Sequence, residues 1–263
     1  MKLRLVPARQ GALWVRRGLR VFFQRPLAYC VLFALCLLLA PLLLFAAAPL
    51  TSLGFMIATG LVLQGRFPLP GVFFEPLRGG GARLRAQLTL CVAYAIGFSL
   101  VFWLADSVGG EAFDAFLQAM RSGKTSPQEL EPLLDAPGLQ AGRALLLGGL
   151  ALLAIPFWHA PALVHWGGLS APKALFFSSV AWWRNKGALL VYALTWFSVG
   201  LVFVVLLTLA FALLGQAQLI MLAIMPSLLV FYAAFYASLY FTFADCFEAP
   251  PSPSDPAHTE TLP

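Results

Sequence analysis

Few residues in this sequence of 263 amino acids have the types and spacing of a reaction centre. His159 and His165 lie six residues apart with Pro161 between them, so they do not share one helix face as the histidines of an HExxH zinc site do. The glycine run 79–81 lacks the Lys-Ser/Thr pair that follows the glycines of a P-loop, and no serine lies in a GxSxG motif. We therefore predict no catalytic residue, no metal site and no cofactor, and a protein that is not an enzyme.

Three tyrosines are the best candidates for an uncharged polar site. Tyr232, Tyr236 and Tyr240 recur at intervals of four residues, which places them along about 12 Å of one helix face. In a transporter they would form a cavity wall, whereas in a closed bundle they would make hydrogen bonds to neighbouring helices. The charged residues give no comparable signal, because no Asp, Glu, Lys or Arg lies in the middle of an apolar segment.

The composition shows what kind of protein must position these side chains. Hydrophobic residues make up 60% of the sequence and charged residues only 11%, against roughly 45–50% and 25% in soluble domains. So few charged residues cannot cover the surface of a soluble globule. The apolar runs also lack the alternation of membrane-barrel strands, and we therefore predict an all-α, polytopic membrane helix bundle.

Six apolar segments are expected to cross the membrane as helices. Residues 27–63 contain no charged residue and are too long for one crossing of about 20 residues, so we divide them at Pro49, which suits a first helical turn. A basic amphipathic segment at 1–26 precedes this transmembrane domain of residues 27–246, and a proline-rich tail at 247–263 is predicted to be disordered. The predicted spans are residues 27–47, 49–64, 86–105, 144–164, 187–214 and 219–244.

The basic residues predict the orientation of these spans. With six spans, 14 of the 17 Lys and Arg residues fall on one side of the membrane, and the positive-inside rule makes this side cytoplasmic. Both termini are therefore predicted to be cytoplasmic. The net charge of +6 is thus a signal of topology, and no nucleic-acid partner is expected. The 14 residues are Lys2, Arg4, Arg9, Arg16, Arg17, Arg20, Arg25, Arg66, Arg78, Arg83, Arg85, Lys173, Arg184 and Lys186.

Two amphipathic helices are predicted to lie in the cytoplasmic interface of the membrane, each next to a span. The first covers residues 8–25, and the second begins after a capping residue, Ser170, and leads into the fifth span. The similarity of Val21–Pro26 to Ala181–Lys186 fits an internal duplication, or two independent aromatic and basic boundaries. Anionic membrane lipids are the expected partners. The residues predicted to contact lipid headgroups are Arg16, Arg17, Arg20, Arg25, Trp182, Trp183, Arg184 and Lys186.

A short helical loop is predicted on the external side, in residues 106–142. Apolar residues between Phe113 and Met120 follow helical spacing, and Gly123 is placed to end that helix. The sequence Ser126–Glu129 has the pattern of a capping box that begins a second helix. These helices either form a lid on the bundle or bind a partner.

Several short segments of the sequence resemble a known group of proteins. They are Gly54–Met56, Gly65–Pro68, Pro161–Ser170 and Ala174–Ser179. In them the chain resembles an uncharacterised family of proteobacterial multi-pass inner-membrane proteins and, more remotely, the membrane domain of some glycerophosphodiester phosphodiesterases. The resemblance extends over most of residues 1–246 and implies a multi-pass protein of the bacterial inner membrane. It implies no hydrolase activity, because the sequence contains no acid-rich soluble domain.

Three classes of function follow from these features. The leading hypothesis is a non-enzymatic inner-membrane protein that binds lipids or a membrane-protein partner through a kinked bundle and its two interfacial helices. The first alternative is a small-molecule or lipid transporter with an uncharged polar cavity at the three tyrosines. The second alternative is a membrane-embedded enzyme, which would require His159, His165 and an acidic residue to converge. The sequence predicts no oligomeric state.

Overall fold

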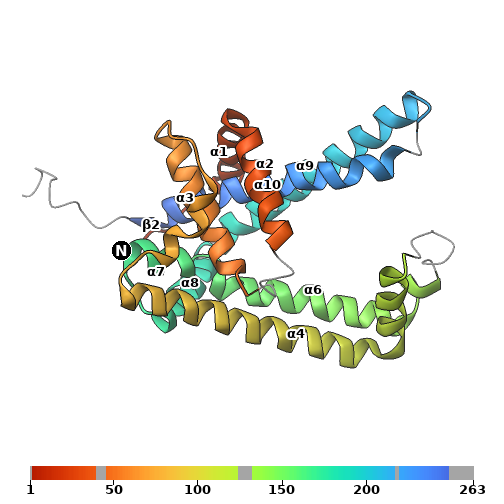
Figure 1. Ribbon diagram of the computed structural model, residues 1–263, viewed down its shortest axis with the longest axis horizontal. Helices are drawn as coiled ribbons and strands as arrows, with labels where there is room; N and C mark the ends of the chain where they lie inside the picture. Colours follow the sequence, from red (N-terminus) through yellow and green to blue (C-terminus); the bar gives the residue numbers. More distant parts are fainter. Residues whose placement is uncertain (1, 40–45, 124–131, 217–218, 249–263) are drawn as a thin grey trace, which may run out of the picture.

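The computed structural model of the protein is almost entirely helical and describes residues 2–39, 46–123, 132–216 and 219–248 (Figure 1). The predicted all-α fold class is confirmed. Two-residue strands, β1 (Lys2–Leu3) and β2 (Phe247–Glu248), pair antiparallel. The helices are α1 (Gln10–Gln24), α2 (Pro26–Leu39), α3 (Ala48–Leu63), α4 (Gly81–Arg121), α6 (Pro137–Phe157), α7 (Ala160–Gly167), α8 (Ala171–Arg184), α9 (Lys186–Leu213) and α10 (Ile220–Cys246), with the short 3-10 helices η1 (Pro70–Phe73) and η2 (Glu75–Leu77).

Fewer helices than predicted have the length and composition of membrane spans. In the described part of the chain, four qualify: α4, α6 together with α7, α9, and residues Leu222–Cys246 of α10. Helices α1 and α2 would add a fifth only if they count as one span, and they are bent by 99° relative to each other. Helix α3 has 16 residues, fewer than the roughly 20 of a crossing. The prediction of six spans is therefore not confirmed, and the structure supports four or five.

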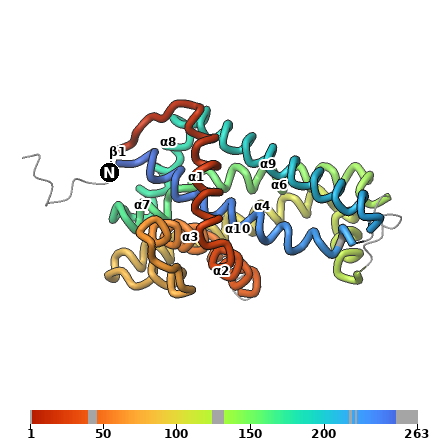
Figure 2. Tube along the Cα trace, turned by 90° about the horizontal axis from the view of Figure 1, so that it is seen from above, coloured from red at the N-terminus to blue at the C-terminus, as the bar shows by residue number. Residues whose placement is uncertain are grey.

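Helices α2 and α3 also run in a different direction from the four long helices. In Figure 1 both lie across the direction of α4, α6, α9 and α10, and in Figure 2, after a turn of 90°, they are seen largely end-on. The predicted division of the apolar run is correct at its second helix, because α3 begins at Ala48 with Pro49 in its first turn. Residues 27–63 thus contribute a helical pair that crosses the long helices instead of two spans parallel to them.

Helices α4 and α6 form a hairpin whose backbones approach closely. A Cβ atom on Gly142 of α6 would lie 2.8 Å from the carbonyl oxygen of Ala105 on α4. A Cβ atom on Gly138 would lie 2.8 Å from the carbonyl oxygen of Gly109. Small residues at helix contacts are typical of membrane bundles, and here they allow the two helices to pack along most of their length.

The loop predicted at residues 106–142 is largely helical. Helix α4 continues beyond its predicted end as far as Arg121, with a break at Gly110, whose φ of +54° interrupts the helical backbone. Gly123, with a φ of +73°, follows the end of this helix as the sequence predicted. The capping-box segment Ser126–Glu129 falls outside the described residues, and the second predicted helix of the loop stays a prediction.

The helices converge on one crowded part of the molecule. In Figures 1 and 2 the α4–α6 and α9–α10 hairpins extend in the same direction, whereas α1, α7, α8 and both strands gather towards the other end. We call this part the basic end; it comprises α1, residues 64–85, α7, α8, and the C-terminal part of α10. The core joins it to the neighbouring helices, because the fully buried large side chains include Trp14 of α1, Tyr29 of α2, Phe55 of α3 and Tyr192 of α9.

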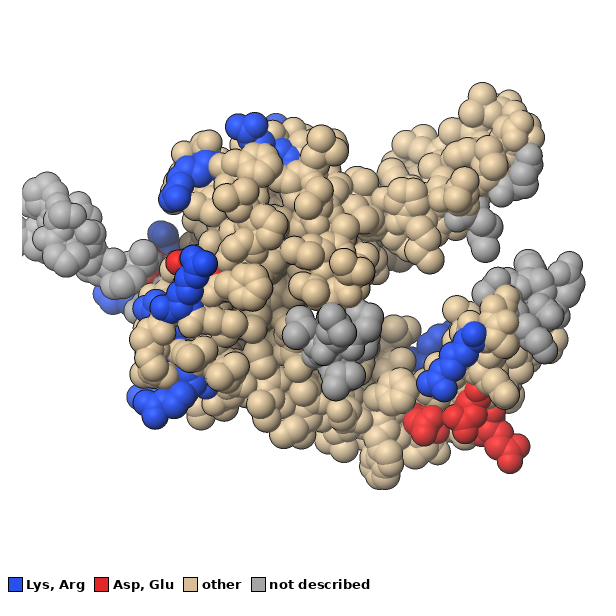
Figure 3. Space-filling model, viewed as in Figure 1, with Lys and Arg blue, Asp and Glu red and all other residues tan. Residues whose placement is uncertain are grey.

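The far half of the α9–α10 hairpin contacts little of the rest of the protein. Residues Leu201–Leu206 of α9 form nearly two helical turns, and each of these side chains is between 37% and 58% exposed. A helix that is apolar on every side needs an apolar surrounding, which a lipid bilayer supplies. Figure 3 shows an open space between this hairpin and the α4–α6 hairpin.

Helix α1 packs against α9 and α10 through two glycines. A Cβ atom on Gly11 would collide with the backbone at Ala188 of α9, and one on Gly18 would collide with Ser238 of α10. The predicted amphipathic helix is thus confirmed, but its predicted position is wrong in one respect. Its apolar face does not lie among lipids, because α9 and α10 cover it and leave Trp14 fully buried.

Helix α8 confirms the second predicted amphipathic helix. It begins at Ala171, after Ser170, but the side chain of Ser170 makes no capping hydrogen bond. Its small residues Ala174 and Ser178 are buried, whereas Phe176 is 62% exposed. Helix α8 therefore buries a face of small residues and leaves an aromatic face uncovered.

The space around two helical glycines, Gly148 of α6 and Gly18 of α1, predicts opposite effects of alanine at these positions. At Gly148 a Cβ atom would meet nothing within 4 Å, so G148A should leave stability unchanged or raise it by up to about 1 kcal/mol, since alanine favours a helix over glycine. At Gly18 a Cβ atom would lie 2.7 Å from Cα of Ser238, so G18A should destabilise the protein by roughly 1–3 kcal/mol. Thermal unfolding of both variants in detergent measures this difference, and equal melting temperatures would contradict it.

Candidate functional site

One carboxylate near the C-terminal end of α10 binds three side chains of α1. Nε1 of Trp14 donates a hydrogen bond of 2.8 Å to Oδ2 of Asp245, and Gln10 and Arg17 also donate to this carboxylate. The guanidinium of Arg17 lies 5.1 Å from the centroid of the Phe241 ring. The ion pair is partly buried, with side-chain exposures of 35% for Arg17 and 21% for Asp245, so salt screens it less than a surface pair. Asp245 therefore holds α1 across the end of α10.

A buried asparagine fixes the N-terminal segment beside the same helix end. Nδ2 of Asn185 donates to the carbonyl oxygen of Arg4 over 3.1 Å, and its Oδ1 accepts from the backbone N–H of Val6 over 3.0 Å. The backbone N–H of Arg4 in turn donates to the carbonyl oxygen of Cys246 over 2.8 Å. Asn185 lies between α8 and α9, so these bonds join both helices to the first residues of the chain.

The arginines predicted to contact lipid headgroups differ in where their side chains lie. Arg16, Arg20 and Arg184 are exposed, as the prediction requires. Arg17 instead turns towards α10 and binds Asp245, which makes it a structural residue in this fold. Figure 3 shows basic side chains over the basic end and a group of acidic side chains at the tip of the α4–α6 hairpin.

Aromatic rings lie beside two other cations that were predicted to contact lipid headgroups. The guanidinium of Arg25 lies 6.0 Å from the centroid of the Phe67 ring, and Nζ of Lys186 lies 4.6 Å from the centroid of the Trp183 ring. The side chain of Trp183 is 67% exposed, whereas Trp182 is half-buried against the core. Exposed pairs of a cation and an aromatic ring suit a membrane interface, where one part of the pair meets water and the other meets lipid.

The three tyrosines predicted as a cavity wall have different surroundings. Tyr232 is 46% exposed, and its ring lies 5.9 Å from the ring of Phe33. Tyr236 packs between Phe33 and Phe55, with centroid distances of 5.7 and 4.8 Å. Tyr240 lines a pocket. Tyr232 and Tyr236 therefore pack on aromatic residues of α2 and α3, and of the three tyrosines only Tyr240 borders a pocket.

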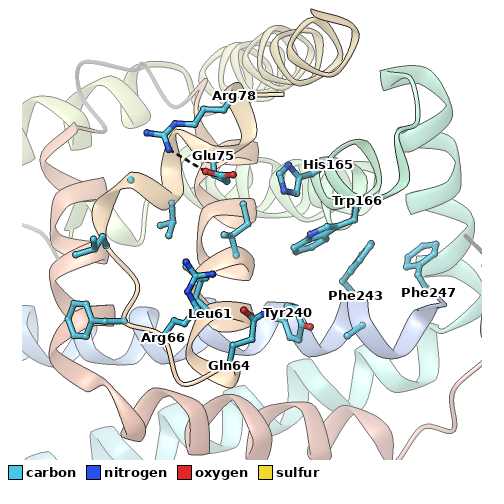
Figure 4. Close-up of a pocket in the computed structure, with 17 residues that line it drawn as sticks. Leu61, Gln64, Arg66, Glu75, Arg78, His165, Trp166, Tyr240, Phe243 and Phe247 are labelled. Carbon is cyan, nitrogen blue, oxygen red and sulfur yellow. Dashed lines mark ion pairs between the residues drawn. The ribbon is translucent and has the colours of Figure 1, made fainter. Parts of the chain in front are cut away.

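A pocket of about 780 Å³ opens at the basic end between α3, residues 64–78, α7 and α10 (Figure 4). One wall is aromatic, because the ring of Trp166 on α7 lies 6.2 Å from that of Tyr240 and 5.2 Å from that of Phe243, both on α10. Helix η1 packs against α3 and holds the connecting segment over the pocket. Residues distant in the sequence thus form one cavity.

Charged and polar side chains face the same pocket from two sides. Nη1 of Arg78 lies 3.5 Å from Oε2 of Glu75, and Arg66 is exposed on the connecting segment. His165 of α7 lines the pocket, and its Nδ1 is buried and has no hydrogen-bond partner among the described residues. The pocket therefore combines two guanidinium groups, one carboxylate and one imidazole with an aromatic wall (Figure 4).

The two histidines that the enzyme hypothesis requires have different surroundings. His159 is fully buried, its backbone N–H donates to Oγ of Ser178 over 3.0 Å, and its Nε2 lies 3.3 Å from Oγ1 of Thr242. His165 lines the pocket and His159 does not. Within the described residues, no three His, Cys, Asp or Glu side chains lie close enough together to hold a metal ion.

The structural role of Asp245 had one recognisable signal in the sequence. On the side of the membrane predicted to be cytoplasmic, the acidic residues before Ala249 are Glu75, Asp245 and Glu248. Each of the three forms an ion pair with a basic residue: Glu75 with Arg78, Asp245 with Arg17, and Glu248 with Arg4. An isolated acidic residue in a basic region is thus a candidate for a specific ion pair.

Comparison with known proteins supports a membrane location for the chain. The chain is similar to a curated protein of Burkholderia thailandensis that is named a probable inner membrane protein. The two sequences are 32% identical over 258 residues, which cover 94% of each chain. No model of a known protein family matches the sequence, and no solved structure matches it.

This relative supports the predicted resemblance to multi-pass inner-membrane proteins, together with the apolar helices. No comparison links the chain to the membrane domain of glycerophosphodiester phosphodiesterases, so that part of the predicted resemblance has no support.

The contacts of Asp245 predict that its charge holds α1 in place. Asp245→Asn leaves the shape of the side chain but removes the charge that three donors share, so the free energy of unfolding should fall by roughly 1.5–3 kcal/mol. Amide hydrogen exchange in residues 10–24 of the detergent-purified protein should become faster.

Glu248→Gln is the matched control for this variant. It removes an ion pair with Arg4 whose side chains are 59% and 47% exposed, so the effect on stability should be at most about 1 kcal/mol. Equal exchange rates of α1 in the two variants would contradict the role of Asp245.

Proposed function

The chain belongs to the same family as the probable inner membrane protein of Burkholderia thailandensis, and on that premise we propose that it binds anionic phospholipids through its basic end without catalysing a reaction. The observation that carries this proposal is the exposure of Arg16 and Arg20 on α1, and of Arg184 and the ring of Trp183 on α8. Each Lys or Arg near an anionic membrane surface contributes about 1 kcal/mol of attraction, and exposed tryptophans favour the interface.

The packing of α1 makes this binding surface rigid. Because Trp14 and Arg17 bind Asp245, the outward arginines project from a helix that is fixed on α9 and α10. A fixed helix loses less conformational entropy on binding than a free amphipathic segment, which would fold only at the membrane. The surface therefore suits lasting contact with headgroups.

We also propose that both termini are cytoplasmic. If α4, α6 with α7, α9 and α10 are the spans, the chain crosses the membrane four times and returns to the side on which it started. The crosswise pair α2–α3 leaves the arginines of residues 64–85 on that same side. Four spans thus give the same separation of basic residues as six, and the positive-inside rule makes the basic end cytoplasmic.

The alternative functions have less support from the described residues. A transporter with a cavity along the tyrosine row is not favoured, because Tyr232 and Tyr236 pack against Phe33. An enzyme is not favoured, because His159 and His165 do not line one pocket. A membrane-protein partner would have apolar surface available on α9, but lipid accounts for that surface equally well.

Lipids that copurify with the protein test the proposed binding surface. The triple variant R16Q/R20Q/R184Q removes three exposed positive charges, so the ratio of phosphatidylglycerol to phosphatidylethanolamine that copurifies should fall severalfold, since each charge contributes about 1 kcal/mol. Quantitative mass spectrometry of lipids retained by the full chain gives this ratio. The double variant R121Q/R143Q removes exposed positive charges beyond the basic end and should retain the wild-type ratio. The same loss in both would overturn the proposal.

Cysteine labelling tests the proposed orientation. In a background without the four native cysteines, Met120→Cys near the tip of the α4–α6 hairpin should react with a membrane-impermeant maleimide added to spheroplasts. Phe67→Cys at the basic end should react only after lysis, although its side chain is 55% exposed. The reverse pattern would show that the basic end faces the periplasm.

A further inference from the structure

The pocket at the basic end has the size and lining of a ligand site. Its volume of about 780 Å³ lies within the range of small-molecule sites, about 300–1,000 Å³. Trp166, Tyr240 and Phe243 form one apolar wall, and a few polar groups face it. An apolar wall with a small number of converging polar side chains is the usual composition of a site for a small molecule.

The charges of the pocket favour an anion. Arg66 and Arg78 both line it, and each presents a planar group of N–H donors that matches the oxygens of a phosphate. Arg78 is paired with Glu75, but the distance is 3.5 Å and the Arg78 side chain is 69% exposed. Exposed ion pairs of this kind contribute little, so a bound anion can compete for the guanidinium.

His165 adds an imidazole to the lining of the pocket. Its buried Nδ1 has no hydrogen-bond partner among the described residues. Buried polar atoms in folded proteins nearly always have a partner, from the protein, from water or from a ligand. This atom has almost no accessible surface, so a water molecule inside the fold suits it better than a ligand in the open pocket.

The position of the pocket narrows the class of anion. Arg66 and Arg78 in its lining belong to the basic end, which we propose faces the membrane surface, and one wall is apolar and aromatic. Phosphate groups joined to an apolar portion fit both features, whereas inorganic phosphate would leave the aromatic wall without contact. Phospholipids have this chemistry, and so do soluble phosphate esters with a short carbon chain.

We propose that this pocket is a specific site for one phosphate-bearing ligand, with the phosphate between Arg66 and Arg78 and the carbon portion against Trp166 and Tyr240. The inference rests on the proposed function and deepens it, because it assigns anionic headgroup binding to one place at the basic end. The pocket selects a single ligand molecule, while the outer arginines attract the leaflet as a whole.

Native mass spectrometry of the full chain in detergent tests the site, with dihexanoyl phosphatidylglycerol as the probe. The wild-type protein should bind one copy saturably. R66Q/R78Q removes both guanidinium groups and should weaken this binding at least tenfold. Gly71→Leu keeps both arginines but fills the pocket, and it should also weaken binding at least tenfold, because Gly71 lines the pocket and a Cβ atom there would meet nothing within 4 Å.

Gly148→Leu is the control for the added side chain. A Cβ atom there also meets nothing within 4 Å, and Gly148 does not line the pocket, so binding should equal that of the wild type. If glycerol 3-phosphate displaces the probe, the ligand is a soluble ester; if only the lipid binds, the source is the membrane. Either result supports a phosphate site.

Wild-type affinity within twofold in both R66Q/R78Q and G71L would overturn the site. This failure is separable from failure of the proposed function. The triple variant R16Q/R20Q/R184Q should keep the single bound copy, since none of its residues lines the pocket. An unchanged ratio of copurifying phosphatidylglycerol to phosphatidylethanolamine in that variant would overturn only the proposed contribution of Arg16, Arg20 and Arg184 to lipid binding.

Discussion

The bonds between Asp245 and α1 hold the two ends of the chain together, and the basic end depends on them. Trp14 and Arg17 reach this one carboxylate from α1, and the close approach of the helices at Gly18 makes the reach possible. Burial of the Trp14 and Phe22 rings then contributes roughly 2–3 kcal/mol each to the free energy of unfolding. Without α1, the surfaces of α9 and α10 that it covers would be exposed, and the outward arginines would have no fixed position.

The helices and the charge separation could be predicted from the sequence, but their packing could not. Helices α9 and α10 lie within two residues of their predicted ends because each is one long apolar run. The crosswise direction of α2 and α3 has no such signal, since an apolar helix suits either lipid or protein neighbours. The role of Gly18 depends on Ser238, more than 200 residues away. The pocket likewise combines Arg66, Trp166 and Tyr240 from separate parts of the chain.

The two proposals place two scales of electrostatic recognition in one part of the protein. In the proposed function, exposed cations beside aromatic rings, such as Lys186 over Trp183, act on the membrane surface without regard to the individual molecule. The pocket behind Arg66 and Arg78 has a defined volume and an aromatic wall, which are the properties that distinguish one ligand from another. In these proposals, a broad attraction through α1 and α8 concentrates the molecules from which the pocket between α3, α7 and α10 selects.

The pairing of β1 with β2 has a consequence for how the protein is made. Lys2 is synthesised long before its partner Glu248, which leaves the ribosome only after the last helix. Helix α1 therefore has no α10 to pack on throughout most of translation, and its apolar face must find another apolar surrounding in the meantime. The membrane interface supplies one, so α1 is expected to rest there as a temporary anchor and to transfer to α9 and α10 as the final step of assembly.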